Sequence, residues 1–453
     1  MKLINDFLNI LNESSSDILI KTSKKAYTKK DVLTDIKKVA TYLKEKNIKK
    51  GSRCLILINK SYEMYIAIIG SILYGVQVVV IDNFKDKVKL KEMITGVDIT
   101  YVLTNNKTLL ITPFIKPLSK ISKINIQKVI KRKNIGDFIF ENITLNQEDT
   151  CLITFTSGGT GKPKSVARTF NELQKQLDLT LSLVSIKNNT YVLATLPIYT
   201  LACIIKGVKI YIPKKKEKLD LVLKQENITM CFASISTFLS LNDSFEKVEE
   251  VLFGGSILYY KEALKIKHSF PSAFIKYIYG ATEASIISIT NIDSYIPHLE
   301  KNNLCLGYVL DTNIVTSIDS ELVVKKGLIT NNYLNIDHES FHRTGDLGDV
   351  IDNQIYIKGR IISYDIVSDY ILELIVKKEF DDIFNIAILK IKNEYHIYIE
   401  EKDIEKRIKI ALILDNHIKN GIIHVVKKLP LDYRHNQKID YKKLLKDEGV
   451  KYV

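Results

Sequence analysis

The sequence has few cysteines, and their spacing supports neither a metal site nor a redox pair. The 453 residues contain five cysteines and no CxxC pair, which the common zinc and redox motifs require. All five are far apart in the sequence: Cys54, Cys151, Cys203, Cys231 and Cys305. Most lie in apolar runs, so we expect buried free thiols in a reducing compartment.

Long hydrophobic runs are also absent. No segment approaches the roughly 18 uninterrupted apolar residues of a membrane-spanning helix. The first residues, MKLINDFLNILNESSSD, are amphipathic and lack the basic region and small-residue cleavage site of a secretory leader. We therefore expect a cytoplasmic protein with no membrane span.

Positive charge is abundant but is not concentrated on a nucleic-acid motif. The formal net charge is +14, yet the lysines are scattered along the chain. Only residues 116–133 form a basic run, and that run has no interleaved aromatic residues for stacking on bases. A solvated basic face is the expectation, and no nucleic-acid partner is predicted.

The length and the hydrophobic pattern predict an α/β protein with more than one domain. A chain of 453 residues, 46% of them hydrophobic, is too long for one ordinary core. The runs CLILIN (54–59), SYEMYIAIIGSILYG (61–75) and VQVVVID (76–82) have the pattern strand, helix, strand. This pattern indicates a βαβ unit, and therefore a parallel sheet covered by helices.

The same alternation recurs further along the chain. Expected strand and helix pairs are 151–155 with 172–184 and 207–213 with 219–228. From about residue 303 the segments become short and β-rich, as in QIYIKGR (354–360), and the C-terminal part mixes strands at 386–400 with a helix around 405–418. We expect a large N-terminal domain of stacked α/β sheets with a β-rich section, residues 1–360, and a small mobile α/β domain, residues 361–453.

A glycine-rich loop, TFTSGGTGKPKS (154–165), follows one of these strands and is expected to precede a helix. Its backbone N–H groups and hydroxyls suit anionic oxygens. It is not the P-loop of nucleotide triphosphatases, because Thr156 stands where that motif needs glycine and Pro163 follows Lys162 where it needs Ser or Thr. A solvated Gly/Ser loop is the alternative reading of these residues alone.

The loop closely resembles the phosphate loop of the adenylate-forming superfamily, which comprises acyl-CoA synthetases, peptide-synthetase adenylation domains and luciferases. The resemblance implies phosphate-binding roles for Thr156, Ser157, Gly158, Thr160, Gly161 and Lys164. Gly159 departs from the Ser or Thr that is usual in the family.

Five further motifs resemble the same family in the expected order. They are GGS (254–256), YGATEAS (279–285), FHRTGDLGDV (341–350), KGR (358–360) and LPLDYRHNQKIDYKKLL (429–445). The resemblance implies that a turn of Gly254, Gly255 and Ser256 lies beside the adenine. It implies nucleotide-binding roles for Tyr279, Gly280, Ala281, Thr282, Asp346 and Arg360. Glu283 is expected to hold Mg²⁺, and Lys438, with Thr282 and Glu283, to act in catalysis.

These residue types suit the joining of a carboxylate to ATP. A carboxylate is a poor electrophile, and transfer of AMP gives it a good leaving group. The two anions repel each other, so the site needs cations and aligned donors. Lys438 is expected to bridge the carboxylate and the α-phosphate, and Glu283 is useful there only with Mg²⁺ between it and the phosphates.

Departures from the family pattern bear on the substrate and the acceptor. Thr200 stands where the family usually has His, and no aspartate near PIYTL (197–201) is available to hold an amino group. An amino acid is therefore disfavoured as substrate. The form of the 429–445 segment resembles that of a subset of fatty- or aryl-acid ligases, and this resemblance implies a fatty or aryl acid. At the hinge, Ile362 replaces the usual Asp or Lys, and Ser368-Asp369 replaces the Ser/Gly-Gly turn beside the pantetheine tunnel.

The resemblance implies an ATP- and Mg²⁺-dependent acid–thiol ligase. It would form an acyl-adenylate and pass the acyl group to CoA or to a carrier protein. Two alternatives remain. The form of the 429–445 segment is similar to that of β-lactone synthetases, which need no thiol, and the departures at Gly159, Thr200 and Asp369 leave open a nucleotide-binding pseudoenzyme.

Overall fold

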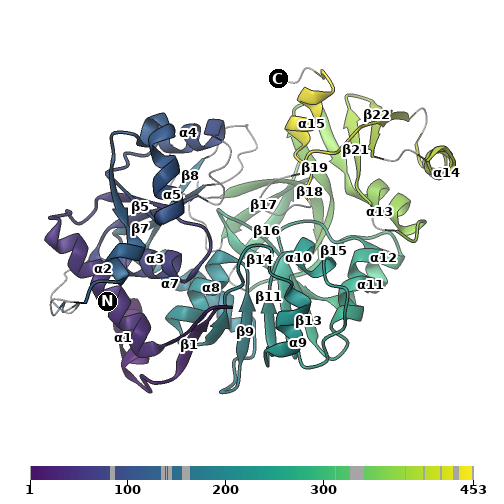
Figure 1. The fold of residues 1–453 in the computed structure, drawn as a ribbon. Coiled ribbons are helices and arrows are strands. Elements are labelled where there is room, and N and C mark those ends of the chain that lie inside the picture. Colours follow the sequence, from purple (N-terminus) through teal and green to yellow (C-terminus); the bar gives the residue numbers. More distant parts are fainter. Residues whose placement is uncertain are drawn as a thin grey trace. The chain divides into compact units, whose positions relative to one another are not determined.

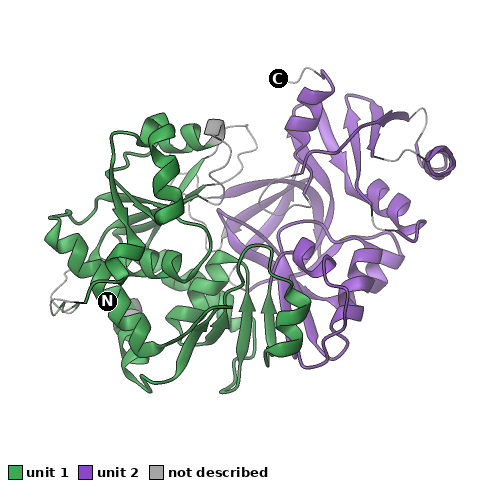
Figure 2. Cartoon of the chain, in the orientation of Figure 1, with its two compact units in different colours: residues 1–232, 330–339 green, residues 233–329, 340–453 purple. Residues whose placement is uncertain are grey.

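The computed structural model divides into two compact units. It describes residues 2–81, 87–133, 138, 140, 145–155, 164–311, 313–326, 341–382, 384–400, 403–418, 421–431 and 438–450. Unit 1 is residues 1–232 with 330–339, and unit 2 is residues 233–329 with 340–453 (Figure 2). The predicted boundary after residue 360 falls inside a strand of unit 2, so a division of the chain there stays a prediction.

Unit 1 holds two sheets. The strands of the first are β3 (Arg53–Leu57), β4 (Gln77–Val80), β5 (Tyr101–Thr104), β6 (Ser122–Asn125), β7 (Thr150–Phe155) and β8 (Ser165–Thr169), in the order β6-β5-β3-β4-β7-β8. All are parallel except β8, which pairs antiparallel with β7. The strands of the second are β1 (Ile18–Lys21), β2 (Ala26–Thr28), β9 (Tyr191–Ala194), β10 (Lys209–Tyr211) and β11 (Met230–Phe232). Here β10 lies between β1 and β9, and β11 pairs with β9.

Some of the helices of unit 1 pack between its two sheets. The helices of unit 1 are α1 (Lys2–Asn12), α2 (Lys29–Glu45), α3 (Tyr62–Tyr74), α4 (Lys87–Thr95), α5 (Asn106–Ile111), α6 (Ile126–Ile130), α7 (Phe170–Ser182), α8 (Pro197–Ile205) and α9 (Leu219–Gln225), with 3₁₀ turns at Thr112–Phe114 and Lys116–Leu118 (Figure 1). α3 packs on β3 and β4, α2 packs on β1 and β2, and α2 contacts α3. In the same way α7 packs on β7 and β8, α8 packs on β9 and β10, and α7 contacts α8. The stacked α/β sheets expected from the sequence are confirmed.

Local sequence signals account for the bounds of these helices. Thr28 caps α2 by accepting from the Asp31 N–H, and the Asp31 carboxylate accepts from the Thr28 N–H, a reciprocal capping box. Ser61 caps the start of α3, and Gly75 ends it with φ +95°, a conformation that favours glycine. The flanking strands β3 and β4 are short apolar runs, as parallel strands buried on both faces require.

Unit 2 is rich in β-structure. Its strands are β12 (Glu250–Gly254), β13 (Phe274–Ala281), β14 (Ser285–Asn291), β15 (Cys305–Val309), β16 (Ile314–Ile318), β17 (Glu321–Lys326), β18 (His342–Ile351), β19 (Gln354–Ser363), β20 (Ile366–Asp369), β21 (Ile386–Ile391), β22 (Glu394–Ile399) and β23 (Ile422–Val425). The long strand β19 pairs with β15, β18 and β20, and it therefore joins the earlier strands of the unit to its C-terminal strands.

Helices of unit 2 cover these strands. They are α10 (Ile235–Leu239), α11 (Tyr260–Ser269), α12 (Ile292–Glu300), α13 (Tyr370–Lys378), α14 (Ile404–Asp415) and α15 (Tyr441–Asp447). α13 contacts α11, α14, β19 and β21. A buried apolar cluster that includes Val376, Ile388, Ile397 and Ile410 fills the space between α13, α14 and the C-terminal strands.

One expectation about the glycine loop needs correction. The element that follows it is not a helix but strand β8, which pairs with β7 at Phe155 and Ser165. The sequence SVART is short and carries polar residues at both ends, so it gives no clear strand signal. The loop residues 156–163 themselves lie outside the described part of the chain.

The structure also bears on the expectations about the cysteines and about membrane-spanning helices. All five cysteines are free and buried, as predicted. Among the described residues, no helix combines the length and the apolar character needed to cross a membrane.

Candidate functional site

A pocket in unit 2 brings together residues from five of the six motifs. It encloses about 810 Å³, part of it open to solvent. Seven predicted site residues line it: Gly255, Ser256, Tyr279, Gly280, Asp346, Arg360 and Lys438. They come from the turn after β12, from β13, β18 and β19, and from the segment before α15.

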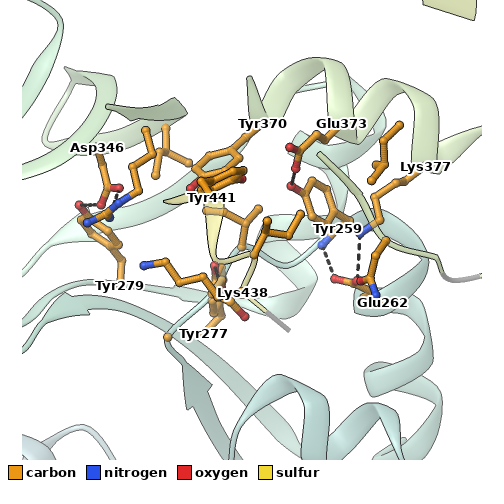
Figure 3. A pocket seen from close by; sticks show the side chains of 18 of the residues that line it. Tyr259, Glu262, Tyr277, Tyr279, Asp346, Tyr370, Glu373, Lys377, Lys438 and Tyr441 are labelled. Carbon is orange, nitrogen blue, oxygen red and sulfur yellow. Dashed lines mark hydrogen bonds and ion pairs between the residues drawn. The ribbon is translucent and has the colours of Figure 1, made fainter. Parts of the chain in front are cut away.

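Asp346 lies at one end of the pocket and accepts two hydrogen bonds. Its Oδ2 accepts from the Tyr279 hydroxyl at 2.8 Å, and its Oδ1 accepts from Arg360 Nη1 at 2.5 Å (Figure 3). Strand pairing produces this arrangement, because Asp346 on β18 stands directly opposite Arg360 on β19. Asp346 raises the pKa of Arg360, and burial followed by Asp346 raises that of Tyr279 well above its usual value. The result is a buried carboxylate with oriented donors.

Glycines bring main chain close together beside this carboxylate. A Cβ on Gly254 would lie 2.4 Å from the Ile278 carbonyl oxygen of the neighbouring strand. Gly255 has φ +97°, a conformation that favours glycine. The carbonyl of Ser256 accepts from the Tyr277 hydroxyl at 2.8 Å, which fixes the turn to β13. These contacts fix the turn 254–256 against β13, and Gly255 and Ser256 of this turn line the pocket.

Thr282 and Glu283 occupy the turn of a hairpin at the end of β13. The strands β13 and β14 pair up to Ala281 and Ser285, so the two residues stand at its tip. Burial lowers the pKa of His342, and the carboxylates of Glu283 and Asp346 act on it in the opposite direction. Glu283 is thus near the start of β18, although Ala281, Thr282 and Glu283 do not line the pocket itself.

The predicted catalytic lysine reaches the Asp346 end of the pocket. Lys438 lines the pocket and its side chain extends toward Tyr279 and Asp346 (Figure 3). Lys164 is half-buried in unit 1, directly before β8. The other phosphate-loop residues, Thr156, Ser157, Gly158, Thr160 and Gly161, lie outside the described residues.

The carboxylates of the site suit Mg²⁺ only when phosphate oxygens complete its coordination. Within the described ranges no cluster of three or more His, Cys, Asp or Glu side chains could hold a metal ion. Mg²⁺ is commonly held by one or two carboxylates together with phosphate oxygens and water. A single carboxylate such as that of Glu283 therefore fits an ion that arrives with a nucleotide.

The other end of the pocket contains residues that the motifs did not indicate. Tyr259 precedes α11 and Glu262 lies in its first turn, while Glu373 and Lys377 lie on α13. The Tyr259 hydroxyl donates to Glu373 Oε2, and Lys377 Nζ lies 3.3 Å from Glu262 Oε1 (Figure 3). Glu373 and Lys377 are four residues apart, which places them on one helical face. That spacing was the only signal in the sequence, and it does not reveal the partners.

Relatives of the chain are adenylate-forming proteins. It is 25% identical to bacitracin synthase 3 of Bacillus licheniformis over 90% of its own residues, and it spans only 7% of that protein's length. It is 24% identical to the D-alanine–D-alanyl carrier protein ligase of Staphylococcus epidermidis, covering 82% of this chain and 81% of the ligase.

Solved structures share the fold. The o-succinylbenzoate CoA synthetase of Bacillus subtilis, solved in complex with its acyl-adenylate intermediate, matches with a TM-score of 0.81 and 17% identity over 97% of each chain. A likeness at this identity concerns the fold. Residues 12–324 match the family model of the AMP-binding enzymes, which is more than half of the sequence, and the chain therefore belongs to that family.

Proposed function

We propose that this protein uses ATP and Mg²⁺ to convert a carboxylic acid into its acyl-adenylate and then passes the acyl group to a phosphopantetheine thiol of CoA or of a carrier protein. The observation that carries the proposal is the pocket of unit 2, in which a buried carboxylate, a close-packed glycine turn and a lysine from distant segments face a common space. Two of the similar proteins support it by their names, the D-alanine–D-alanyl carrier protein ligase and the o-succinylbenzoate CoA synthetase.

Each residue has a role that follows from its chemistry. Asp346 is a buried acceptor suited to the ribose hydroxyls, and Arg360 holds it in place through their ion pair. Tyr279 and the Gly255 turn form the wall for the adenine ring. Lys438 provides a positive charge for the carboxylate and the α-phosphate as they approach. Mg²⁺, held by Glu283, would neutralise charge on the phosphates.

The substrate class is proposed as a fatty or aryl acid. Thr200, which stands where the family usually has His, is fully buried in α8. Its hydroxyl donates to the Leu196 carbonyl at 2.9 Å. The o-succinylbenzoate CoA synthetase is named for an aromatic acid, which supports this class. The D-alanine–D-alanyl carrier protein ligase is named for an amino acid, so amino acids are the competing class.

The test is ATP–pyrophosphate exchange with a panel of fatty, aryl, β-hydroxy and amino acids. We expect one class to stimulate exchange, and Lys438→Ala to reduce it by about three orders of magnitude. The estimate takes about 4 kcal/mol for a charge roughly 4 Å from the reacting groups, at about 1.4 kcal/mol for each factor of ten.

Lys443→Ala is the matched control, because Lys443 is an exposed lysine in the next helix, α15, and it should leave exchange unchanged. Stimulation by amino acids alone would replace the proposed substrate class. ATP binding without exchange from any acid would contradict the proposed activity.

A further inference from the structure

Two buried contacts join α11 to α13 at the end of the pocket away from Asp346. One is the hydrogen bond from the Tyr259 hydroxyl to Glu373, and the other is the ion pair of Lys377 with Glu262. The Lys377 Nζ also lies 3.9 Å from the centre of the Tyr259 ring, which connects the two contacts. We call these four residues the α11–α13 network.

The network is buried and its polar groups are satisfied. The residues Glu262, Glu373 and Lys377 are 3%, 2% and 8% exposed. Glu373 also accepts from the Ile388 N–H at 3.0 Å, and Glu262 accepts from the Tyr259 N–H at 2.9 Å. Buried ion pairs add little net stability compared with apolar packing, whereas loss of one partner is costly. A network of this kind accordingly specifies one arrangement of the helices it joins.

The network continues to the segment that carries the catalytic lysine. Tyr441 is three residues after Lys438 and begins α15. It is buried, and its pKa is raised well above the usual value, first by burial and next by the carboxylate of Glu373. Glu373, Tyr441 and Lys438 all line the same pocket (Figure 3). Tyr441 also hydrogen-bonds with Tyr370, the first residue of α13. This contact joins the start of α15 to α13, and the network joins α13 to α11.

We infer that Glu262, Glu373 and Lys377 are positioning residues for the adenylation step. They hold α13 and the start of α15 against α11, so that the Lys438 amine is directed at the Asp346 end of the pocket. None of the three is assigned contact with the nucleotide. The expected effect on the rate of adenylation rests on the proposed function. The expected effect on the packing of α13 and α15 rests on the structure alone.

The kinetic test compares Lys377→Met with the double variant Glu262→Gln, Lys377→Met. The single variant leaves the Glu262 carboxylate buried without its cation, whereas the glutamine side chain of the double variant keeps an oxygen that accepts from the Tyr259 N–H and carries no charge. We expect the single variant to lose about 100-fold in pyrophosphate exchange at saturating ATP and acid, as for a catalytic group displaced by about 1 Å. The dissociation constant for ATP should change little, and the double variant should recover most of the lost rate.

A milder variant covers the case in which Lys377→Met fails to fold. Tyr259→Phe removes only the hydroxyl that donates to Glu373 and keeps the ring beside Lys377. We expect it to lower the exchange rate about 10-fold, again with little change in ATP binding. Equal rates in the unaltered protein and in Tyr259→Phe, or a single Lys377→Met variant no slower than the double one, would overturn the inference.

A second readout needs no substrate. Amide hydrogen exchange of the ligand-free protein should become faster in α13 and α15 for Lys377→Met, stay unchanged in α7 of unit 1, and return toward the original rate in the double variant. Unchanged protection of α15 would overturn the inference. The expected pattern of hydrogen exchange, found in a protein that no acid stimulates, would uphold the coupling of α15 to α11 and reject the proposed function.

Discussion

Asp346 is central to the nucleotide binding that we propose for the pocket. Its carboxylate is 7% exposed and accepts from both Tyr279 and Arg360. Three strands supply these side chains, and the register of β18 with β19 places Asp346 opposite Arg360. A neutral side chain at this position would leave the Arg360 guanidinium mostly buried without its counter-charge, which is the costly way to break a buried pair.

Asp346→Asn should therefore lower both stability and ATP affinity. We expect the free energy of unfolding to fall by about 3 kcal/mol, measured by urea denaturation. Binding of ATP, measured by calorimetry, should weaken because Asn accepts ribose hydroxyls less strongly than a carboxylate does.

The control lies on the same two strands. Asp349 and Lys358 form an ion pair at 2.5 Å, with Lys358 exposed and Asp349 half-buried, so Asp349→Asn should change the unfolding free energy by about 1 kcal/mol or less and leave ATP binding intact. Equal losses in the two variants would contradict the role given to Asp346.

At the scale of elements, the junction of β19, β20 and α13 determines how the C-terminal residues leave the sheet. Gly359 pairs with Asp369, and a Cβ on Gly359 would lie 1.9 Å from the Ser368 carbonyl oxygen. Asp369 then caps α13 by accepting from the Leu372 N–H at 2.9 Å. This cap gives Asp369 a structural role, and its predicted place beside a pantetheine tunnel remains a prediction.

Asp369→Gly tests that prediction at little cost to the helix. Glycine in place of Asp at an N-cap costs only a few tenths of a kcal/mol. If the carboxylate obstructs the thiol, the variant should form thioester faster, measured as acyl transfer from preformed acyl-adenylate.

Asp369→Asn keeps the cap and the bulk but removes the charge, so it separates the two effects. An acceleration in the glycine variant but not in the asparagine variant would identify bulk as the obstacle. An unchanged or slower rate in Asp369→Gly would refute the prediction.

At the scale of the molecule, the buried carboxylate of Glu373 makes stability depend on pH. Burial raises its pKa from 4.5 to about 7, against the opposing effects of Tyr259, a backbone amide and Lys377, and Asp369 adds to the rise. Tyr441 also faces it. Glu373 binds its proton more tightly in the folded protein than in the unfolded chain. Its contribution to the free energy of unfolding is therefore greatest below about pH 4.5 and is lost as the pH rises to about 7.

Glu373→Gln should remove this dependence. Relative to the unaltered protein, we expect the variant to gain about 3 kcal/mol in unfolding free energy between pH 4.5 and pH 8, since 2.5 pKa units correspond to about 3 kcal/mol. Denaturation curves at pH 5 and pH 8 give the comparison. Parallel pH dependence in the two proteins would show that Glu373 does not carry the effect.

Much of the fold and part of the site could be predicted from the sequence, because these features are written in local patterns. The apolar runs at 54–59 and 76–82 became β3 and β4, and the periodic segment at 61–75 became α3. Motif order also indicated that Tyr279, Asp346 and Lys438 belong to one pocket. These features are predictable because propensity, periodicity and capping act over only a few neighbouring residues.

Only the tertiary structure decided which side chains meet across long distances in the sequence. Tyr259 and Glu373 are 114 residues apart, and Glu262 and Lys377 are 115 apart. In the sequence these residues look like ordinary polar positions on amphipathic helices. They become buried and paired when α11 packs against α13, and the resulting desolvation raises the pKa of Glu373. No local pattern encodes that contact, because the two helices are far apart in the sequence.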